Sequence, residues 1–365
     1  MGSEGFFKAT EPDGTAPPSG GVRRSRLLGI EQRLLRRLRG REFGPGTILV
    51  VGFSGGTDSL ALAAALGRVA DLGRVEIILA QVDHGLRPES PAEQDRAEEI
   101  ARLLALRFHR LALDSHPAER HPGVGIEEAA RRERFRVLAA LCREAGARCL
   151  VLAHQRDDQA ETVLLHLLRG AGLPGARGMA EWGERSVPWW DASDGVDVLG
   201  IWRPLLDEAR VDLAAYIAAR GLAAIADPSN DDHRFRRNEV RHVLLPQVEA
   251  VVPGAAAALA RYGRLVAADD DALDGWARRL VRSGTAADGS FTLATLRHEP
   301  PAVARRAVRV WLGDQSRGTI EVTAERVEAL LERIATEAGG RIELGGGWTA
   351  VARSGRLGLN RAGEG

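Results

Sequence analysis

The sequence predicts an α/β protein with a doubly wound, mostly parallel sheet, followed by a small helical domain that carries a short antiparallel unit. Two patterns support this prediction. Between about residues 46 and 206, short apolar runs alternate with segments of helical periodicity, which is typical of parallel strands joined by helices. From residue 341 onward, apolar and polar residues alternate between glycine turns, as they do in antiparallel hairpins.

The elements of the first part follow in chain order. Apolar, β-branched runs predict strands near residues 47–53, 75–83, 108–114, 148–154 and 198–207, and helical spacing predicts helices near 59–72, 91–107, 126–146, 157–170 and 208–222. The second of these helices has a marked start, because Ser90 can cap it, Pro91 suits its first position and Glu93 completes a capping box. Residues 170–200 are rich in glycine and tryptophan, and we expect a long connection there.

Composition divides the chain further. Residues 1–22 are rich in Gly, Pro, Ser and Thr, so we expect a disordered tail. We place a first domain at 23–228, a basic linker helix at 229–250 and a C-terminal domain at 251–365. In the last of these, alanine-rich and arginine-rich helices precede the antiparallel unit.

Charge and cysteine content limit the class of protein. Lys+Arg and Asp+Glu both number 50, so nucleic-acid binding would have to come from local basic patches. The two cysteines, Cys142 and Cys149, form neither a zinc spacing nor a disulfide framework, which fits a reducing compartment. The chain has no run of 18 apolar residues and no apolar leader at its start. We therefore expect a cytoplasmic protein that does not enter a membrane.

A glycine-rich loop follows the first predicted strand and leads into a helix; its residues are Ser54, Gly55, Gly56, Thr57, Asp58 and Ser59. Backbone N–H groups of such a loop form an anion site at the helix N-terminus, and the hydroxyl groups add donors. The loop lacks the lysine of a Walker sequence, and Asp58 would repel phosphate unless Mg²⁺ lies between them. The alternative is a plain strand-to-helix turn capped by serine.

Other polar residues also follow predicted strands. Asp83 and His84 come after the second strand and His154 after the fourth, and ligands of doubly wound sheets bind beyond these strand ends. Asp158 and Glu161 are three residues apart on a predicted helix, so they share a face on which they could bind Mg²⁺ or an ammonium group. The alternatives are a strand-end cap for Asp83 and a solvated helix start for the two acids.

The S-G-G-x-D-S loop resembles that of the PP-loop, or N-type, ATP pyrophosphatases, which cleave ATP between its α- and β-phosphates. Four further stretches narrow the resemblance: VDHGLRPESPAEQ (82–94), EEAARRERF (127–135), LAHQRDDQAETVLLHLLRGAGLPG (152–175) and SNDDHRFRRNEVRHVLLP (229–246). In this order they resemble the tRNA(Ile)-lysidine synthetases from about residue 46 to 246, with a weaker likeness beyond.

The resemblance implies a Rossmann-like PP-loop ATPase domain at 23–228 and a tRNA-binding domain at 251–365. It implies a ligase that uses ATP and Mg²⁺ to adenylate carbon 2 of the wobble cytidine in the CAU anticodon of tRNA(Ile). Free L-lysine would then displace AMP and leave lysidine. The chain ends soon after the antiparallel unit, so we expect a short form without the further C-terminal domain of longer members. The sequence does not decide the oligomeric state, and a homodimer is one candidate.

The resemblance also assigns roles to residues. Those expected to be catalytic are Asp58, Arg131, His154, Asp158 and Glu161. The loop 54–59, Asp83 and His84 would bind ATP, and Asp58 and Asp158 would hold Mg²⁺. Arg131 would stabilise charge on the α-phosphate. The alternative for Arg131 is a surface arginine paired with Glu127 or Glu128, and we favour that interpretation for its neighbours Arg132, Arg134 and Arg136.

A basic stripe is predicted near residue 237. Arg234, Arg237 and Arg241 are three and four residues apart, so they line one helix face with Asn238 beside them, which suits an RNA backbone. With Arg87, these are the residues expected to contact tRNA. The alternative is a solvated face balanced by nearby acids. A weaker basic patch contains Arg305, Arg306 and Arg309.

Three other functions are possible for such a sequence. A PP-loop tRNA thiolase needs reactive cysteines, whereas Cys142 and Cys149 are placed as small buried apolar residues. A small-molecule PP-loop ligase would not need the basic stripe. A noncatalytic nucleotide- or RNA-binding module would not need Asp58, Asp158 and Glu161 together.

Overall fold

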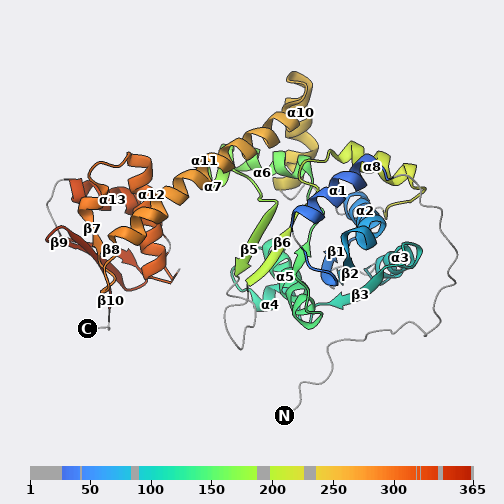
Figure 1. Ribbon diagram of the computed structural model, residues 1–365, viewed down its shortest axis with the longest axis horizontal. Coiled ribbons are helices and arrows are strands. Elements are labelled where there is room, and N and C mark those ends of the chain that lie inside the picture. The colour runs from blue at the N-terminus through green and yellow to red at the C-terminus, as the bar shows by residue number, and fades with distance from the viewer. Residues whose placement is uncertain are drawn as a thin grey trace, which may run out of the picture. The chain divides into compact units, whose positions relative to one another are not determined.

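The computed structural model describes residues 27–41, 43–83, 90–186, 198–225, 236–317, 319–320, 322–335 and 340–362. The predicted tail at 1–22 and the residues His84, Arg87 and Arg234 lie outside these ranges. The chain forms two compact units, Met1–Gly263 and Arg264–Gly365, and the division falls within helix α11 (Ala255–Gly284). Figure 1 shows the elements of each unit.

The first unit is built on a six-stranded sheet with the order β3-β2-β1-β4-β6-β5. Its strands are β1 (Thr47–Gly52), β2 (Val75–Asp83), β3 (Arg107–Ala112), β4 (Cys149–Val151), β5 (Trp182–Ser186) and β6 (Val198–Trp202). All neighbouring pairs are parallel except β5 with β6. The doubly wound, mostly parallel sheet predicted from the sequence is confirmed, and its strand order reverses between β1 and β4.

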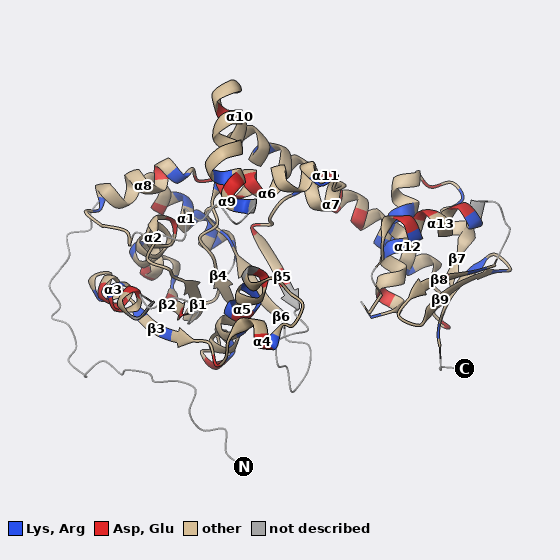
Figure 2. Ribbon diagram, turned by 180° about the vertical axis from the view of Figure 1, so that it is seen from behind, with Lys and Arg blue, Asp and Glu red and all other residues tan. Residues whose placement is uncertain are grey.

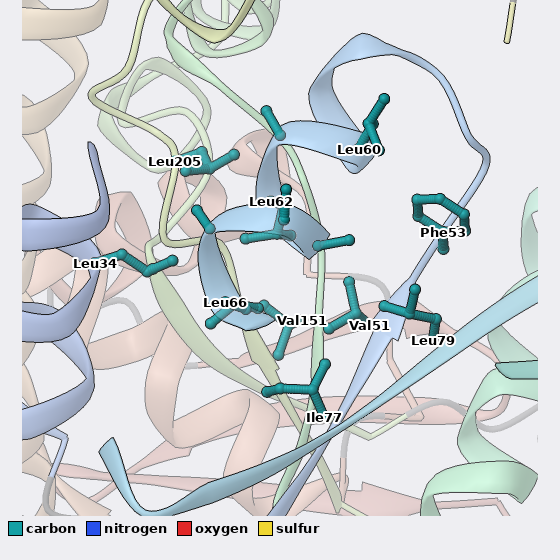
Figure 3. Packing of buried hydrophobic residues seen from close by; sticks show 14 of the residues in the cluster. Leu34, Val51, Phe53, Leu60, Leu62, Leu66, Ile77, Leu79, Val151 and Leu205 are labelled. Carbon is teal, nitrogen blue, oxygen red and sulfur yellow. The ribbon is translucent and has the colours of Figure 1, made fainter. Parts of the chain in front are cut away.

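The helices of this part are α1 (Gly29–Gly40), α2 (Thr57–Gly73), α3 (Ser90–Leu103), α4 (Pro117–Arg120), α5 (Ile126–Glu144), α6 (Arg156–Leu168), α7 (Leu173–Ala176) and α8 (Arg210–Ala219). Both faces of the sheet are covered, one by α2 and α3 with α1 and α8, and the other by α5. Successive residues of β1 point to opposite faces, so Val51 joins the cluster with α1, α2 and α8, and Val50 joins the cluster with α5. Residues Leu60–Leu66 of helix α2 are all buried, because this helix packs against the sheet and contacts α1 and α8. Figure 3 shows Leu60, Leu62 and Leu66 of this helix beside buried residues of the sheet. Each fully buried leucine there, such as Leu62, contributes roughly 1.5–3 kcal/mol.

Residues 170–200 contain more regular structure than the long connection we expected. Strand β5 pairs antiparallel with β6 at the edge of the sheet. Its Trp182 contacts the ring of Phe43 with centroids 6.3 Å apart, and Arg41 lies over its ring at 5.1 Å. The run WGERS has little apolar alternation because an edge strand has a neighbour on one side only, and this is why the pattern did not reveal it.

The first unit ends with a helical run that contains α9 (Arg236–Glu239), the π-helical turn η2 (Val240–Leu244) and α10 (Leu245–Val251). Pro246 lies in the first turn of α10 and has no N–H to continue the hydrogen-bond ladder. A widened turn directly before it fits this interruption. Such turns often occur at functional sites.

The second unit combines helices with a four-stranded antiparallel sheet of order β7-β10-β9-β8. After α11 its elements are β7 (Phe291–Thr292), η3 (Leu293–Leu296), α12 (Pro301–Gln315), α13 (Ala324–Ala335), β8 (Gly340–Gly345), β9 (Trp348–Arg353) and β10 (Arg356–Arg361). The rings of buried Phe291 and Trp311 stack with centroids 6.1 Å apart. The predicted helical region with a short antiparallel unit is confirmed.

Within the described ranges, no single helix is both long enough and apolar enough to cross a bilayer.

Candidate active site

A cavity of about 510 Å³ lies at the carboxyl ends of β1, β2 and β4, where the strand order reverses. This is the usual place for a ligand in a doubly wound sheet, and the volume is within the range of about 300–1,000 Å³ of small-molecule sites. The lining comes from the loop after β1, the end of β2, the start of α3, α5, the residues after β4, the starts of α6 and α8, Ile225 and the turn η2. The sheet topology thus brings distant parts of the sequence to one place.

The loop after β1 has the form of an anion site. Gly55 has φ = 77°, which only glycine adopts without strain, and α2 begins two residues later at Thr57. The Ser59 hydroxyl accepts a hydrogen bond from the Ser54 N–H at 3.2 Å and donates to the Gly56 carbonyl at 3.1 Å, which closes the loop on itself. No side chain caps α2, so its first N–H groups are available to phosphate oxygens.

Asp58 lies in the first turn of α2 and faces the cavity. Burial raises the pKa of its carboxyl group to about 6, although the Arg210 guanidinium 3.8 Å away favours the charged form. Its Oδ1 is buried and has no hydrogen-bond partner among the described residues. A buried carboxylate oxygen without a partner, beside a phosphate loop, fits an Mg²⁺ ligand.

The start of α6 holds Asp158 in place. The Gln155 side chain accepts a hydrogen bond from the Asp157 N–H at 2.6 Å, and Asp158 Oδ2 accepts one from the Gln155 N–H at 3.0 Å. This is a reciprocal cap. The Arg156 N–H donates to the carbonyl of Glu208, whose carboxylate is bound by Arg33 at 2.6 Å. These contacts fix the position of Asp158 at the carboxyl ends of the parallel strands.

Asp158 and Glu161 are both buried, and two arginines bind them together. Arg241 donates to Asp158 Oδ1 and to Glu161 Oε1, each at 2.6 Å, and Arg237 donates to the same two carboxylates at 3.3 and 3.0 Å. Burial opposes the charge on Asp158, but His154 and both arginines hold its pKa below the usual range. The acidic start of α6 and the basic α9 meet in this region (Figure 2).

This cluster was not foreseen from the sequence. We expected Arg237 and Arg241 to contact tRNA, and the structure joins them to the two acids expected to be catalytic. Both oxygens of Asp158 are used in these contacts, so of the two carboxylates expected to hold Mg²⁺, Asp58 is the better candidate. Among the described residues, no group of three or more His, Cys, Asp or Glu could hold a metal, so a bound Mg²⁺ would also need phosphate oxygens.

His154 follows β4 and lines the cavity, as predicted. Burial lowers its pKa to about 3, so the ring is neutral near pH 7. Its Nδ1 is buried and has no hydrogen-bond partner in the described parts of the chain. A neutral imidazole with a free nitrogen can accept a hydrogen bond from a ligand.

The arginines of α5 differ from our expectation. The Arg131 side chain is half exposed, pairs with Glu128 at 3.5 Å and does not line the cavity, whereas Arg134 does. Arg134 precedes Leu138 by four residues, and both lie on the helix face toward the cavity. Arg131 lies three residues before Arg134 and seven before Leu138, so helical spacing alone does not distinguish the two arginines. Arg210 and Ile225 also line the cavity and were missed.

The remaining predicted residues are placed as follows. Ser54, Gly56, Thr57 and Ser59 line the cavity, and Gly55 is buried beneath Ile225. Asp83 ends β2 and does not line the cavity, whereas Gln81 and Val82 do. Asn238 is half-buried in α9. His84, Arg87 and Arg234 lie outside the described residues.

Both cysteines are buried, Cys142 in α5 and Cys149 in β4. Burial raises the pKa of each thiol to about 12, so neither is a thiolate at neutral pH. A buried, protonated thiol is a poor nucleophile.

Comparison with known proteins identifies the family. Residues 30–248 match the family model described as a PP-loop domain, and residues 291–357 match the model described as a TilS substrate binding domain. A tRNA(Ile)-lysidine synthase of Novosphingobium aromaticivorans is 35% identical over 321 residues, which cover 88% of this chain and 90% of that protein. The chain belongs to the tRNA(Ile)-lysidine synthase family. The family prediction made from the loop and the four further stretches is confirmed.

Members of the tRNA(Ile)-lysidine synthase family differ in length. The relative from Geobacter sulfurreducens is 35% identical over 309 residues, or 83% of this chain and 62% of the relative. A relative from Thermus thermophilus is 37% identical over 281 residues, or 77% of this chain and 50% of the relative. The chain therefore spans half to two thirds of the length of these two proteins.

One solved structure shows the same fold. A U34-tRNA thiolase, NcsA from Methanococcus maripaludis with its [4Fe-4S] cluster, matches with a TM-score of 0.53 and 15% identity, covering 65% of this chain and 78% of the thiolase chain. At this identity the likeness concerns the fold alone. A tRNA(Ile)-lysidine synthase and this thiolase thus share a scaffold.

Proposed function

We propose that the protein ligates free L-lysine to carbon 2 of the wobble cytidine in the CAU anticodon of tRNA(Ile), with ATP converted to AMP and pyrophosphate. Membership of the tRNA(Ile)-lysidine synthase family supports the reaction. The observation that carries the proposal is the cavity in which the phosphate loop faces His154 and the carboxylate of Asp158. An ATP site and a site for an amine nucleophile would be adjacent there.

In the first step, the loop 54–59 would bind the β- and γ-phosphates of ATP, which leave together as pyrophosphate. The cytidine O2 attacks the α-phosphorus, a bond to AMP forms and the bond to pyrophosphate breaks. Asp58 would hold Mg²⁺ against the phosphates, where the ion neutralises phosphate charge. Arg134 and Arg210 line the same cavity and would stabilise the charge that develops on the α-phosphate.

In the second step, the lysine amine attacks carbon 2 and AMP leaves with the former cytidine oxygen. The buried carboxylates of Asp158 and Glu161 would attract the ammonium group of lysine, and neutral His154 would accept a hydrogen bond from the attacking amine. Arg237 and Arg241 already neutralise these carboxylates, so lysine would share or replace their contacts.

The tRNA contacts remain proposals. We assign the domain at 251–365 to tRNA binding, in agreement with the description of the family model that matches residues 291–357. Arg87, Arg234 and Asn238 are kept as proposed tRNA contacts, and the last two belong to the predicted linker segment 229–250. Because Arg237 and Arg241 bind the acids of α6, they would meet the tRNA only at its reacting nucleotide. We propose a cytoplasmic location, which a tRNA substrate and the lack of reactive cysteines would suit. We also propose a homodimer, which sedimentation would test.

The reaction is tested by measuring pyrophosphate release with ATP, Mg²⁺, CAU-anticodon tRNA(Ile) and radiolabelled lysine. One labelled lysine incorporated into tRNA for each pyrophosphate released would support the ligase, and Asp158→Ala should abolish incorporation. A parallel reaction supplies a sulfur donor in place of lysine. Pyrophosphate release without lysine transfer would contradict the lysidine assignment while retaining the ATP chemistry.

Two arginine variants give a matched comparison on one helix. We expect Arg134→Ala to lower kcat by about 100-fold or more, the usual effect of removing a donor to developing charge. Arg131→Ala, one turn earlier and exposed, should change kcat by less than about three-fold, because surface pairs contribute little. Equal effects of the two variants would contradict the assignment of Arg134.

A further inference from the structure

The segment after α8 crosses the phosphate loop. Its residues Leu222, Ala224 and Ile225 pack against the same apolar cluster as α2. At its end, the Ile225 N–H donates a hydrogen bond to the Gly55 carbonyl at 2.9 Å. Ile225 also lines the cavity. A residue far along the sequence therefore contacts the centre of the loop.

The side chain of Ile225 covers Gly55. A Cβ atom placed on Gly55 would lie 2.4 Å from Ile225 Cδ1 and 3.0 Å from Cγ1, so the isoleucine occupies the space that a side chain at position 55 would need. Gly55 also has φ = 77°. Glycine is required here both for its backbone angle and for the close approach of Ile225.

These contacts set the direction of one peptide group. The C=O and N–H of a trans peptide point in opposite directions, so a Gly55 carbonyl bound by Ile225 directs the Gly56 N–H away from Ile225. On that side, inside the loop, the Gly56 N–H donates a long hydrogen bond to the Ser54 hydroxyl oxygen at 3.4 Å, which a phosphate oxygen would share or replace. A peptide between two glycines has little intrinsic preference for one orientation, because neither residue has a Cβ atom. Of the two hydrogen bonds that orient this peptide, the one from Ile225 is the shorter.

We propose that Ile225 is a positioning residue for the phosphate loop: its N–H and side chain hold the Gly55–Gly56 peptide so that the Gly56 N–H faces the pyrophosphate group of the bound nucleotide. The proposal rests on the proposed function in that it takes the loop to bind the phosphates of ATP. Ile225 acts through the loop and does not itself contact phosphate. Truncation of its side chain loosens the segment and lets the peptide turn, which removes one preformed donor.

The test uses inorganic pyrophosphate with Mg²⁺, titrated calorimetrically into the full chain, because this probe has no base or ribose that Ile225 could contact directly. We expect Ile225→Ala to weaken pyrophosphate binding about tenfold, as for the loss of one hydrogen bond to a charged group. The dissociation constant of Ile225→Val for pyrophosphate should stay within about three-fold of the wild-type value, because valine keeps a branched Cβ. In Ile225→Ala, the KM for ATP should rise together with the dissociation constant for pyrophosphate, while the KM for lysine stays unchanged.

Leu222→Ala is the matched control, because Leu222 packs in the same apolar cluster as Ile225. It should lower the thermal stability without changing pyrophosphate affinity. Equal losses of affinity in Leu222→Ala and Ile225→Ala would reduce the effect to general packing and overturn the proposal. Unchanged pyrophosphate binding by Ile225→Ala, with weakened AMP binding, would make Ile225 an apolar wall of the nucleoside site and also overturn it. A wild-type protein that binds neither pyrophosphate nor ATP would contradict the proposed function instead.

Discussion

Neutralising Asp58 should stabilise the ligand-free protein while abolishing its activity. Burial raises the pKa of this carboxyl from 3.8 to about 6, and Arg210 reduces the shift without cancelling it. The folded state therefore binds the proton more tightly than the unfolded state, so ionisation of Asp58 destabilises the fold progressively between these two pKa values and fully above about pH 6. At about 1.36 kcal/mol for each pKa unit, a shift of roughly two units corresponds to about 3 kcal/mol at pH 8.

The variant Asp58→Asn removes the ionisable group at nearly constant volume. We expect an increase in the free energy of unfolding of about 2–3 kcal/mol at pH 8, or roughly 5–10 °C in the Tm of the first unit. The gain should be about half as large at pH 5 and nearly absent at pH 4, because the window lies between the two pKa values. Pyrophosphate release should be lost, since the phosphates and Mg²⁺ would lack the carboxylate.

The assay is thermal unfolding of the full chain without ligand at the three pH values. The two units can unfold separately, so the relevant transition is the one that ATP with Mg²⁺ shifts in the wild type. Asp71→Asn, an exposed carboxylate on the same helix, serves as the control and should stay within about 0.5 kcal/mol. A variant no more stable than the wild type at pH 8, or a gain that grows toward pH 5, would refute the reasoning.

Three further predictions follow from the buried contacts. Arg241→Met and Glu161→Gln should each lower the free energy of unfolding by about 2 kcal/mol, because each leaves a buried charge without its partner. In the double variant, the total loss of stability should be at least about 1 kcal/mol smaller than the sum of the two single losses. Additive losses would mean that the pair is not coupled. Iodoacetamide at pH 8 should leave Cys142 and Cys149 unmodified in the native protein, because both thiols are buried and protonated. The variant Cys142→Ala should retain lysine transfer, and loss of transfer in this variant would indicate a cysteine-dependent activity. Gly200→Ala should lower the free energy of unfolding by about 1–3 kcal/mol in urea denaturation, because its Cβ would lie 3.0 Å from Trp182 Cη2. The control is Gly183→Ala on the neighbouring strand, whose Cβ would meet open space. Its stability should differ from that of the wild type by less than about 1 kcal/mol.

The central part of the fold could be predicted from local pattern. Strand β2 runs from Val75 to Asp83, as the apolar run predicted, because a strand buried on both faces has an almost continuous apolar sequence. Strand β5 was missed because its residues at the sheet edge carry no such pattern. The second-unit hairpins were recognisable from their glycines, two of which, Gly346 and Gly347, have φ of 60° and 79°.

The candidate site likewise contains residues that the sequence predicted and residues that it did not. The loop Ser54–Ser59, His154 and Asp158 were accessible from the sequence, since strand ends and helix starts mark where a parallel sheet places its ligands. Arg131 was preferred to Arg134 because helical periodicity defines faces but does not say which face a neighbouring cavity meets. Only the packing of α5 against the sheet decides that.

By itself the sequence determined most of the strands and helices of the first unit, the phosphate loop and the family, because each depends on residues that are close together in the chain. The tertiary structure alone decided that Arg237 and Arg241 bind Asp158 and Glu161, and that Ile225 lies on Gly55. These contacts join residues far apart in sequence, and no local spacing encodes them. They form because the sheet brings the ends of its strands together. Buried carboxylates at these ends need cationic partners, and the space beside Gly55, which has no side chain, is filled by Ile225 from a later segment.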